Sequence, residues 1–230
     1  MINVAIIPAR GGSKRIKHKN IKMFYGKPII QRTFEVVKKS KIFDYIYVST
    51  ESDKIIKICK NVGIDYFIKR PKTLSGDKIG ISEVMEHAIK KLGKKINFTN
   101  VCCIFPCSPF LSIKNLKKAL KKVKSNKKYL VHAVSKYSHP PERRLLMNHD
   151  SILKPVNKEN MNKNTQSFAQ SYYDLGQFYF SHKSVWGSNP KTVKRVGIEI
   201  SHWDSVDIDN IEDWKLAEKL FKFRKRSLTK

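Results

Sequence analysis

Two groups of residues in this 230-residue chain have the types and spacing that phosphate and metal chemistry require. The first follows the apolar run NVAIIPA (3–9) and consists of Arg10, Gly11, Gly12, Ser13 and Lys14. Glycines after a strand let backbone N–H groups turn toward an anion, and nearby guanidinium and ammonium groups bind phosphate oxygens. The segment therefore predicts a phosphate-binding turn, although it matches neither the Walker nor the dinucleotide fingerprint. An ordinary strand-to-helix turn with surface cations is the alternative.

The second group is the carboxylate pair in WDSVDIDN (203–210). Side chains of an extended segment alternate between faces, so Asp207 and Asp209 share one face, about 7 Å apart at Cα. Two such carboxylates suit one Mg²⁺ ion that is also bound by phosphate oxygens. The alternative is that Asp209 only forms the N-cap of the amphipathic helix that follows.

Apolar strands and amphipathic helices alternate over the first two thirds of the chain. This alternation predicts βαβ units in a three-layer α/β fold, with a mostly parallel sheet flanked by helices on both faces. No linker divides the chain, so residues 1–230 form one expected domain. The predicted strands are 3–9, 45–50, 65–70, 100–106 and 129–137, and the predicted helices are 28–40, 53–63, 81–93 and 113–125.

The alternation breaks at a polar insertion, residues 138–172, where no strand or helix is expected. A loop of this length in a compact domain is either mobile or functional. Beyond it the pattern predicts strands at 176–182 and 194–201, and a closing helix at 209–227.

The formal net charge is +28, which would ordinarily indicate a nucleic-acid partner. Lysine supplies 38 of the 47 cations, scattered over every predicted helix, and no nucleic-acid-binding motif is present. No apolar run reaches 18 residues, and the amino terminus has the pattern of a first strand, not of a signal peptide. We therefore expect a cytoplasmic protein without a membrane or nucleic-acid partner. The four cysteines are expected to be reduced core thiols, since no histidine lies at zinc-ligand spacing.

The amino-terminal stretch IIPARGGSK, followed by Lys19-Asn20, resembles the signature of the cytidylyltransferases that activate nonulosonic acids, the nine-carbon α-keto sugar acids. The resemblance implies a Rossmann-like nucleotidyltransferase fold in which residues 10–14 and Asn20 bind the triphosphate of CTP. It implies that Arg10 and Lys14 are catalytic, because they neutralise the charge that develops as pyrophosphate leaves. It also implies that Asp207 and Asp209 hold the catalytic Mg²⁺.

Three further assignments depend on this resemblance. The Arg70-Pro71 pair matches a family motif, which implies that Arg70 contacts the nucleotide, and an exposed cation at the end of a strand is the alternative. The stretch DLGQFY resembles the pseudaminic acid branch of the family, as do Arg15 and Phe105, so Asp174, Gln177 and Tyr179 become candidate sugar ligands. The alternative for this stretch is a half-buried strand with aromatic packing. Arg144, in the polar insertion, is the candidate partner of the sugar carboxylate, and a solvated surface arginine is its alternative.

The expected reaction is therefore the formation of CMP-pseudaminic acid and pyrophosphate from CTP and pseudaminic acid. The same reaction on N-acetylneuraminic or legionaminic acid is the alternative, and a basic nucleic-acid-binding protein on this fold is a remote one. The resemblance further implies a homodimer in which residues 138–172 of one subunit close the sugar pocket of the other. The sequence does not identify the general base.

Overall fold

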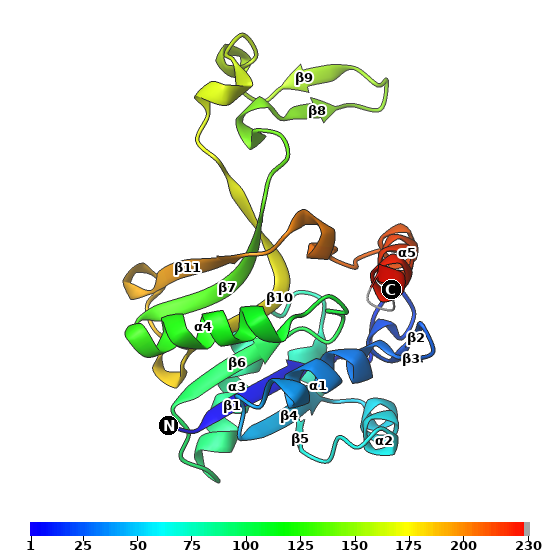
Figure 1. Cartoon of the computed structure of the whole chain (residues 1–230), viewed down its shortest axis with the longest axis vertical. Helices are drawn as coiled ribbons and strands as arrows, with labels where there is room; N and C mark the ends of the chain where they lie inside the picture. The colour runs from blue at the N-terminus through cyan, green and yellow to red at the C-terminus, as the bar shows by residue number, and fades with distance from the viewer. Residues whose placement is uncertain (228–230) are drawn as a thin grey trace.

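The computed structural model describes residues 1–227 and has the predicted alternation of strands and helices (Figure 1). The first part of the chain supplies five strands and four helices of the main α/β unit: β1 (Asn3–Pro8), α1 (Ile29–Ser40), β4 (Tyr45–Thr50), α2 (Asp53–Asn61), β5 (Phe67–Lys69), α3 (Ile81–Gly93), β6 (Asn100–Ile104), α4 (Ile113–Ser125) and β7 (Tyr129–Lys136). The last part supplies β10 (Tyr172–His182), β11 (Lys194–Glu199) and α5 (Ile211–Ser227). A small hairpin of β2 (Met23–Phe24) and β3 (Lys27–Pro28) precedes α1.

The seven-stranded sheet has the order β11-β7-β10-β6-β1-β4-β5. Six strands run in one direction, and β10 is antiparallel to both of its neighbours, β6 and β7. The prediction of an α/β fold with a mostly parallel sheet is confirmed. The direction of β10 has a topological reason, since the chain returns from the polar insertion directly into the sheet without a crossover helix.

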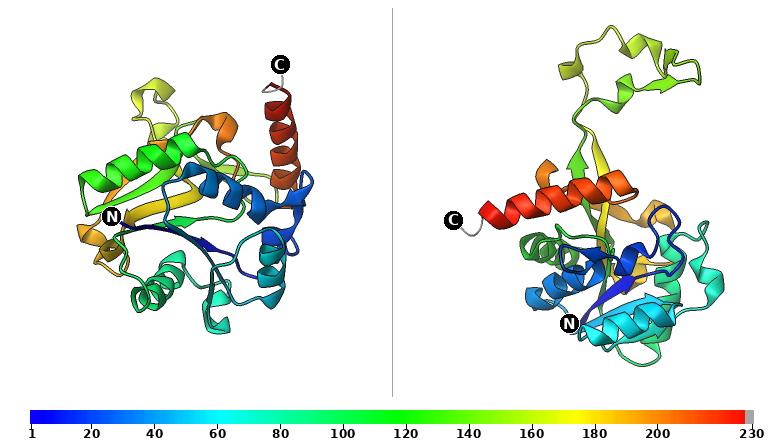
Figure 2. Two further views of the ribbon diagram at one scale, coloured as in Figure 1. Left: turned by 60° about the horizontal axis from the view of Figure 1, so that its bottom comes forward. Right: turned by 90° about the vertical axis from the view of Figure 1, so that its right-hand side faces the viewer.

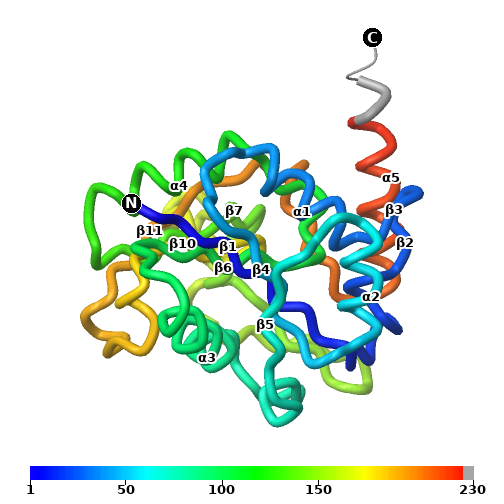
Figure 3. The backbone as a smooth tube through the Cα atoms, turned by 90° about the horizontal axis from the view of Figure 1, so that it is seen from below, coloured from blue at the N-terminus to red at the C-terminus, as the bar shows by residue number. Residues whose placement is uncertain are grey.

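The core forms two layers on either side of this sheet, because successive side chains of a strand point to opposite faces. In β1, Ala5 and Ile7 pack against α1, α2 and α4, whereas Val4 and Ile6 pack against α3. Figure 3 shows α3 on the opposite side of the sheet from α1 and α4. The continuous apolar run at the start of the chain is therefore a central strand, buried on both faces.

Residues 137–171, between β7 and β10, form an arm that extends away from the sheet (Figure 1, and the right-hand view of Figure 2). The expectation of no strand in this insertion was wrong. The arm contains a hairpin of β8 (Leu145–Met147) and β9 (Leu153–Pro155), and β10 begins at Tyr172, before its predicted start. The strand continues through a register shift between Asp174 and Tyr179, where Gly176 adopts a left-handed conformation with φ of +56°.

Helix composition and cysteine state can both be read from the structure. Among residues 1–227, no helix has the length and apolar composition that a bilayer crossing requires. All four cysteines are free thiols, and burial raises the pKa of each of them.

Candidate active site at the carboxyl edge of the sheet

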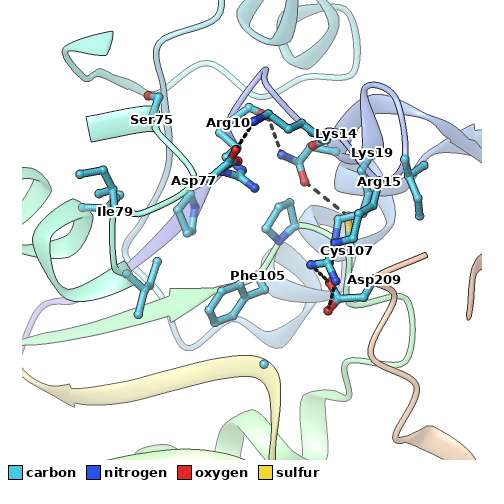
Figure 4. A pocket seen from close by; sticks show the side chains of 18 of the residues that line it. Arg10, Lys14, Arg15, Lys19, Ser75, Asp77, Ile79, Phe105, Cys107 and Asp209 are labelled. Carbon is cyan, nitrogen blue, oxygen red and sulfur yellow. Dashed lines mark hydrogen bonds and ion pairs between the residues drawn. The ribbon is translucent and has the colours of Figure 1, made fainter. Parts of the chain in front are cut away.

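A cavity of about 380 Å³ lies at the carboxyl ends of β1 and β6. Most of its wall comes from four segments that are far apart in the sequence: the turn after β1 and its continuation, the loop after β5, the residues after β6, and the extended segment before α5. The start of α3 and Gly176 of β10 complete it. Figure 4 shows the cationic side chains and Asp209 around this cavity. The two groups of residues that the sequence selected, from opposite ends of the chain, are therefore brought to one site: Arg10, Ser13, Lys14 and Asn20 with Asp207 and Asp209.

Arg10 and Lys14 both extend toward Asp77, in the loop after β5 (Figure 4). Arg10 Nη1 donates to Asp77 Oδ1 at 2.8 Å, and Lys14 Nζ lies 2.6 Å from Asp77 Oδ2. The hydrogen bonds and positive charges of Lys14 and Arg10 hold the pKa of Asp77 below its usual value. The sequence analysis missed Asp77, which follows a glycine six residues after Pro71.

The two glycines, which were expected to bind the triphosphate, do not line the main cavity. Gly11 and Gly12 line a smaller adjoining cavity, and the Gly11 N–H donates to Glu51 Oε1 at 2.6 Å. Glu51 Oε2 accepts from Arg70 Nη2 at 3.1 Å and from Ser75 Oγ at 2.8 Å. Burial alone would raise the pKa of Glu51. Hydrogen bonds from the Gly11 and Glu51 backbone N–H groups and from Ser75, with the charge of Arg70, outweigh burial and lower the pKa. A partly buried carboxylate thus joins the glycine turn to Arg70 and Ser75.

Arg70 and Asn20 both line the cavity and both have structural partners. The Arg70 side chain is only 4% exposed and pairs with Glu51. Asn20 is buried, and its Nδ2 donates to the carbonyl oxygen of Arg10 at 2.8 Å. Glu51 was another residue that sequence reasoning missed, although it directly follows β4 at the same edge of the sheet.

The two aspartates of the acid pair have unequal surroundings. Asp209 accepts two hydrogen bonds from the Arg15 guanidinium, at 2.9 and 3.0 Å, and lies 3.5 Å from Lys19 Nζ. Among residues 1–224, whose side chains the structure describes, Asp207 has no side-chain hydrogen bond or ion pair. The N-cap alternative for Asp209 was wrong, because Asn210 Oδ1 accepts from the N–H groups of the first turn of α5, at 2.8 and 3.0 Å.

The acid pair fits a hard divalent cation. Burial of Asp207 and the negative charge of Asp209 together raise the pKa of Asp207. A divalent cation between the two carboxylates would remove that repulsion, and oxygen is the ligand that Mg²⁺ prefers. Within the described residues, no cluster of three histidine, cysteine, aspartate or glutamate side chains could hold a metal by itself. A cation on this pair would therefore take its other ligands from water and phosphate oxygens.

The candidate sugar ligands on β10 lie beside the cavity and not in its wall, where only Gly176 of that stretch appears. Asp174 Oδ2 accepts from Tyr179 Oη at 2.8 Å, and the Tyr179 ring packs edge-on against Phe105, which does line the cavity. Gln177 is 3% exposed, and its Oε1 has no hydrogen-bond partner within the described residues. Arg144 lies at the start of the arm, outside the cavity of its own chain. The sugar-binding roles of these residues stay predictions.

A seven-stranded α/β sheet with basic side chains and a carboxylate pair around one cavity at its carboxyl edge has the architecture of a nucleotidyltransferase. The chain belongs to the cytidylyltransferase family, whose model matches residues 4–225. The resemblance seen in the sequence is thus confirmed at the level of the family.

Similar proteins support the same assignment. The chain is 31% identical over 230 residues to the pseudaminic acid cytidylyltransferase of Campylobacter jejuni subsp. jejuni serotype O:2, with 99% of each chain covered. It is 27% identical over 235 residues to the CMP-N,N'-diacetyllegionaminic acid synthase of Legionella pneumophila subsp. pneumophila, with 98% of each covered. The solved structure of a CMP:2-keto-3-deoxy-manno-octonic acid synthetase complexed with CTP has a TM-score of 0.72 and 14% identity, with 97% of this chain and all of that chain covered. This last likeness shows the fold alone.

Proposed function

We propose that this protein transfers the cytidylyl group of CTP to pseudaminic acid, forming CMP-pseudaminic acid and pyrophosphate. The main support is the meeting of the basic turn and the acid pair at one cavity, in a chain of the cytidylyltransferase family. The choice of sugar has its support in the full-length identity to a pseudaminic acid cytidylyltransferase and in the DLGQFY stretch of β10.

In the proposed reaction the C2 hydroxyl oxygen of the sugar attacks the α-phosphorus of CTP, and the bond to the bridging oxygen of pyrophosphate breaks. Arg10 and Lys14 neutralise the charge on the departing pyrophosphate, an interaction that is stronger in the transition state than in the ground state. Arg70, held by Glu51, forms part of the wall against which the nucleotide lies. The glycine turn keeps its shape because Glu51 and Asn20 hold its backbone.

Asp207 and Asp209 would hold a Mg²⁺ ion, which supplies a positive charge on the phosphate oxygens and a template for their alignment. Arg15 occupies one acceptor site on each Asp209 oxygen and leaves the other lone pairs of this carboxylate for a cation. Lys19 Nζ donates to the carbonyl oxygen of Ile208 at 2.6 Å, which holds its positive charge beside the acid pair.

We further propose that two copies of the chain associate through the arm. Its hairpin exposes a concentrated set of large apolar side chains, between 42% and 67% accessible: Leu145, Leu146, Met147, Ile152, Leu153 and Val156. An exposed apolar patch rimmed by polar residues is typical of a protein interface. Met147→Glu is expected to yield a monomer in light scattering, whereas Met23→Glu, an exposed methionine on the body, is expected to leave a dimer. A monomeric wild-type chain would contradict the proposal.

The activity is tested by measuring pyrophosphate release with CTP and each of pseudaminic, N-acetylneuraminic and legionaminic acids. Asp207→Ala is expected to abolish turnover and to leave the circular dichroism spectrum unchanged. The control is Asp53→Ala, which removes an exposed carboxylate on α2 and is expected to leave turnover unchanged. Wild-type rates in Asp207→Ala would exclude the metal role. Turnover on another sugar far above that on pseudaminic acid would move the protein to that branch. No turnover on any sugar, with tight salt-sensitive RNA binding, would favour the nucleic-acid alternative.

A further inference from the structure

The loop between Pro71 and Gly80 lines the cavity and places one carboxylate on the two cations assigned to the triphosphate (Figure 4). Each Asp77 oxygen contacts a different cation: Oδ1 contacts Arg10 at 2.8 Å, and Oδ2 contacts Lys14 at 2.6 Å. A phosphate group presents two oxygens in the same way, and the guanidinium and ammonium groups bind either anion. The carboxylate therefore lies where an oxyanion would otherwise bind.

The contacts of Asp77 are open to water. The exposed fraction of the side chain is 44% for Asp77, 38% for Arg10 and 81% for Lys14. Ion pairs in such surroundings are weak, because water and salt screen them. An incoming anion with more charge can therefore replace Asp77 on both cations.

The loop can release Asp77 without loss of the structure around it. On one side, Ser75 is fastened to Glu51, and on the other, the Gly80 N–H donates to Glu83 Oε2 at 2.9 Å at the start of α3. Within the described residues, the side chain of Asp77 has no hydrogen-bond or ion-pair partners besides Arg10 and Lys14. Its departure leaves both fastenings intact.

We propose that Asp77 is a specificity-determining residue that competes with the β- and γ-phosphates for Arg10 and Lys14; this inference rests on the proposed function. A triphosphate or a pyrophosphate displaces the carboxylate, whereas a nucleoside monophosphate has no β- or γ-phosphate with which to do so. Once pyrophosphate has left, Asp77 again neutralises the two cations. The residue thus weakens retention of pyrophosphate and separates the binding of CTP from that of CMP.

The test is calorimetric binding of inorganic pyrophosphate and of CMP to the full-length chain in EDTA. Asp77→Asn is expected to bind pyrophosphate roughly two- to fivefold more tightly than the wild type, the range set by a weak exposed ion pair, with CMP affinity unchanged. Asp53→Asn, which removes an exposed carboxylate paired with Lys69 away from the cavity, controls for the added positive charge and is expected to change neither affinity. Equal melting temperatures of the two variants show that the fold is retained.

The inference is overturned if Asp77→Asn binds pyrophosphate no more tightly than the wild type, or if CMP affinity rises by the same factor. Absence of pyrophosphate binding in both proteins also overturns it. The proposed function fails separately, when wild-type protein releases no pyrophosphate from CTP with any of the sugars. Tighter pyrophosphate binding by Asp77→Asn would then still show that Asp77 competes for an oxyanion site.

Discussion

Replacement of Glu51 by glutamine tests the carboxylate that joins three segments of the site. The Glu51 side chain is 13% exposed, and its partner Arg70 is 4% exposed. An amide of the same shape has one acceptor oxygen and one NH₂ group. In either orientation, the NH₂ group therefore faces a donor: the Gly11 N–H, or Arg70 and the Ser75 hydroxyl. Removal of one partner of a buried ion pair destabilises a protein by about 3–5 kcal/mol. Because glutamine keeps one acceptor oxygen, we expect Glu51→Gln to lower the free energy of unfolding by about 3 kcal/mol, the lower end of that range.

In a chain of this size, 1 kcal/mol shifts the melting temperature by about 2–4 °C, so Glu51→Gln is expected to melt about 6–12 °C below the wild type. The control is Glu35→Gln, which breaks the partly exposed Lys27–Glu35 pair and is expected to lower the melting temperature by less than about 4 °C. Calorimetric melts at pH 7 supply both values. If the melting temperature of Glu51→Gln equals that of the Glu35→Gln control, the structural role of the Glu51 carboxylate is refuted.

Three further results are expected. Gly11→Ala places a Cβ 3.1 Å from Ser52 Cβ, so this variant should have a lower melting temperature and a lower affinity for CTP. Gly12→Ala has no neighbouring atom within 4 Å of the new Cβ and should keep the wild-type melting temperature. Equal melting temperatures of the two variants would contradict the crowding at Gly11. Since the folded protein raises the pKa of Asp207, ionisation of this carboxyl removes stability as the pH rises. In EDTA, Asp207→Asn should therefore gain stability relative to the wild type as the pH rises above the ordinary aspartate pKa of 3.8, and a flat difference between denaturant melts over that range would exclude this. Tyr179→Phe removes a donor to Asp174, so an NMR titration should give Asp174 a higher pKa than in the wild type, and an unchanged value would show that the hydrogen bond has no effect.

Much of the fold follows from patterns that are local in the sequence. A continuous apolar run, or an alternation of apolar and polar residues, predicts a strand, and apolar residues at every third or fourth position predict a helix. These periods predicted β1 and the helices on both faces of the sheet with ends within a few residues of those observed. The rule that ligands bind at the carboxyl ends of parallel strands then selected the turn after β1 without any knowledge of the rest of the chain.

The elements that escaped prediction depend on contacts between distant segments. Within the described part of the chain, the apolar residues of β8 and β9 belong to no buried cluster, and strands of three residues are too short to give a periodic signal in the polar insertion. The direction of β10 depends on the path by which the chain returns from the arm, and not on its own residues.

The site divides in the same way. The sequence by itself determined which residue types could bind phosphate and metal: glycines and cations after β1, and two acids at alternate positions before α5. Only the tertiary structure decided how those groups are paired, with Glu51 on Gly11 and Arg70, Asp77 on Arg10 and Lys14, and Arg15 on Asp209 across 194 positions of sequence. The physical reason is that periodicity reports which face of its own element a side chain occupies, whereas the charge that it meets depends on which strand ends the sheet brings together.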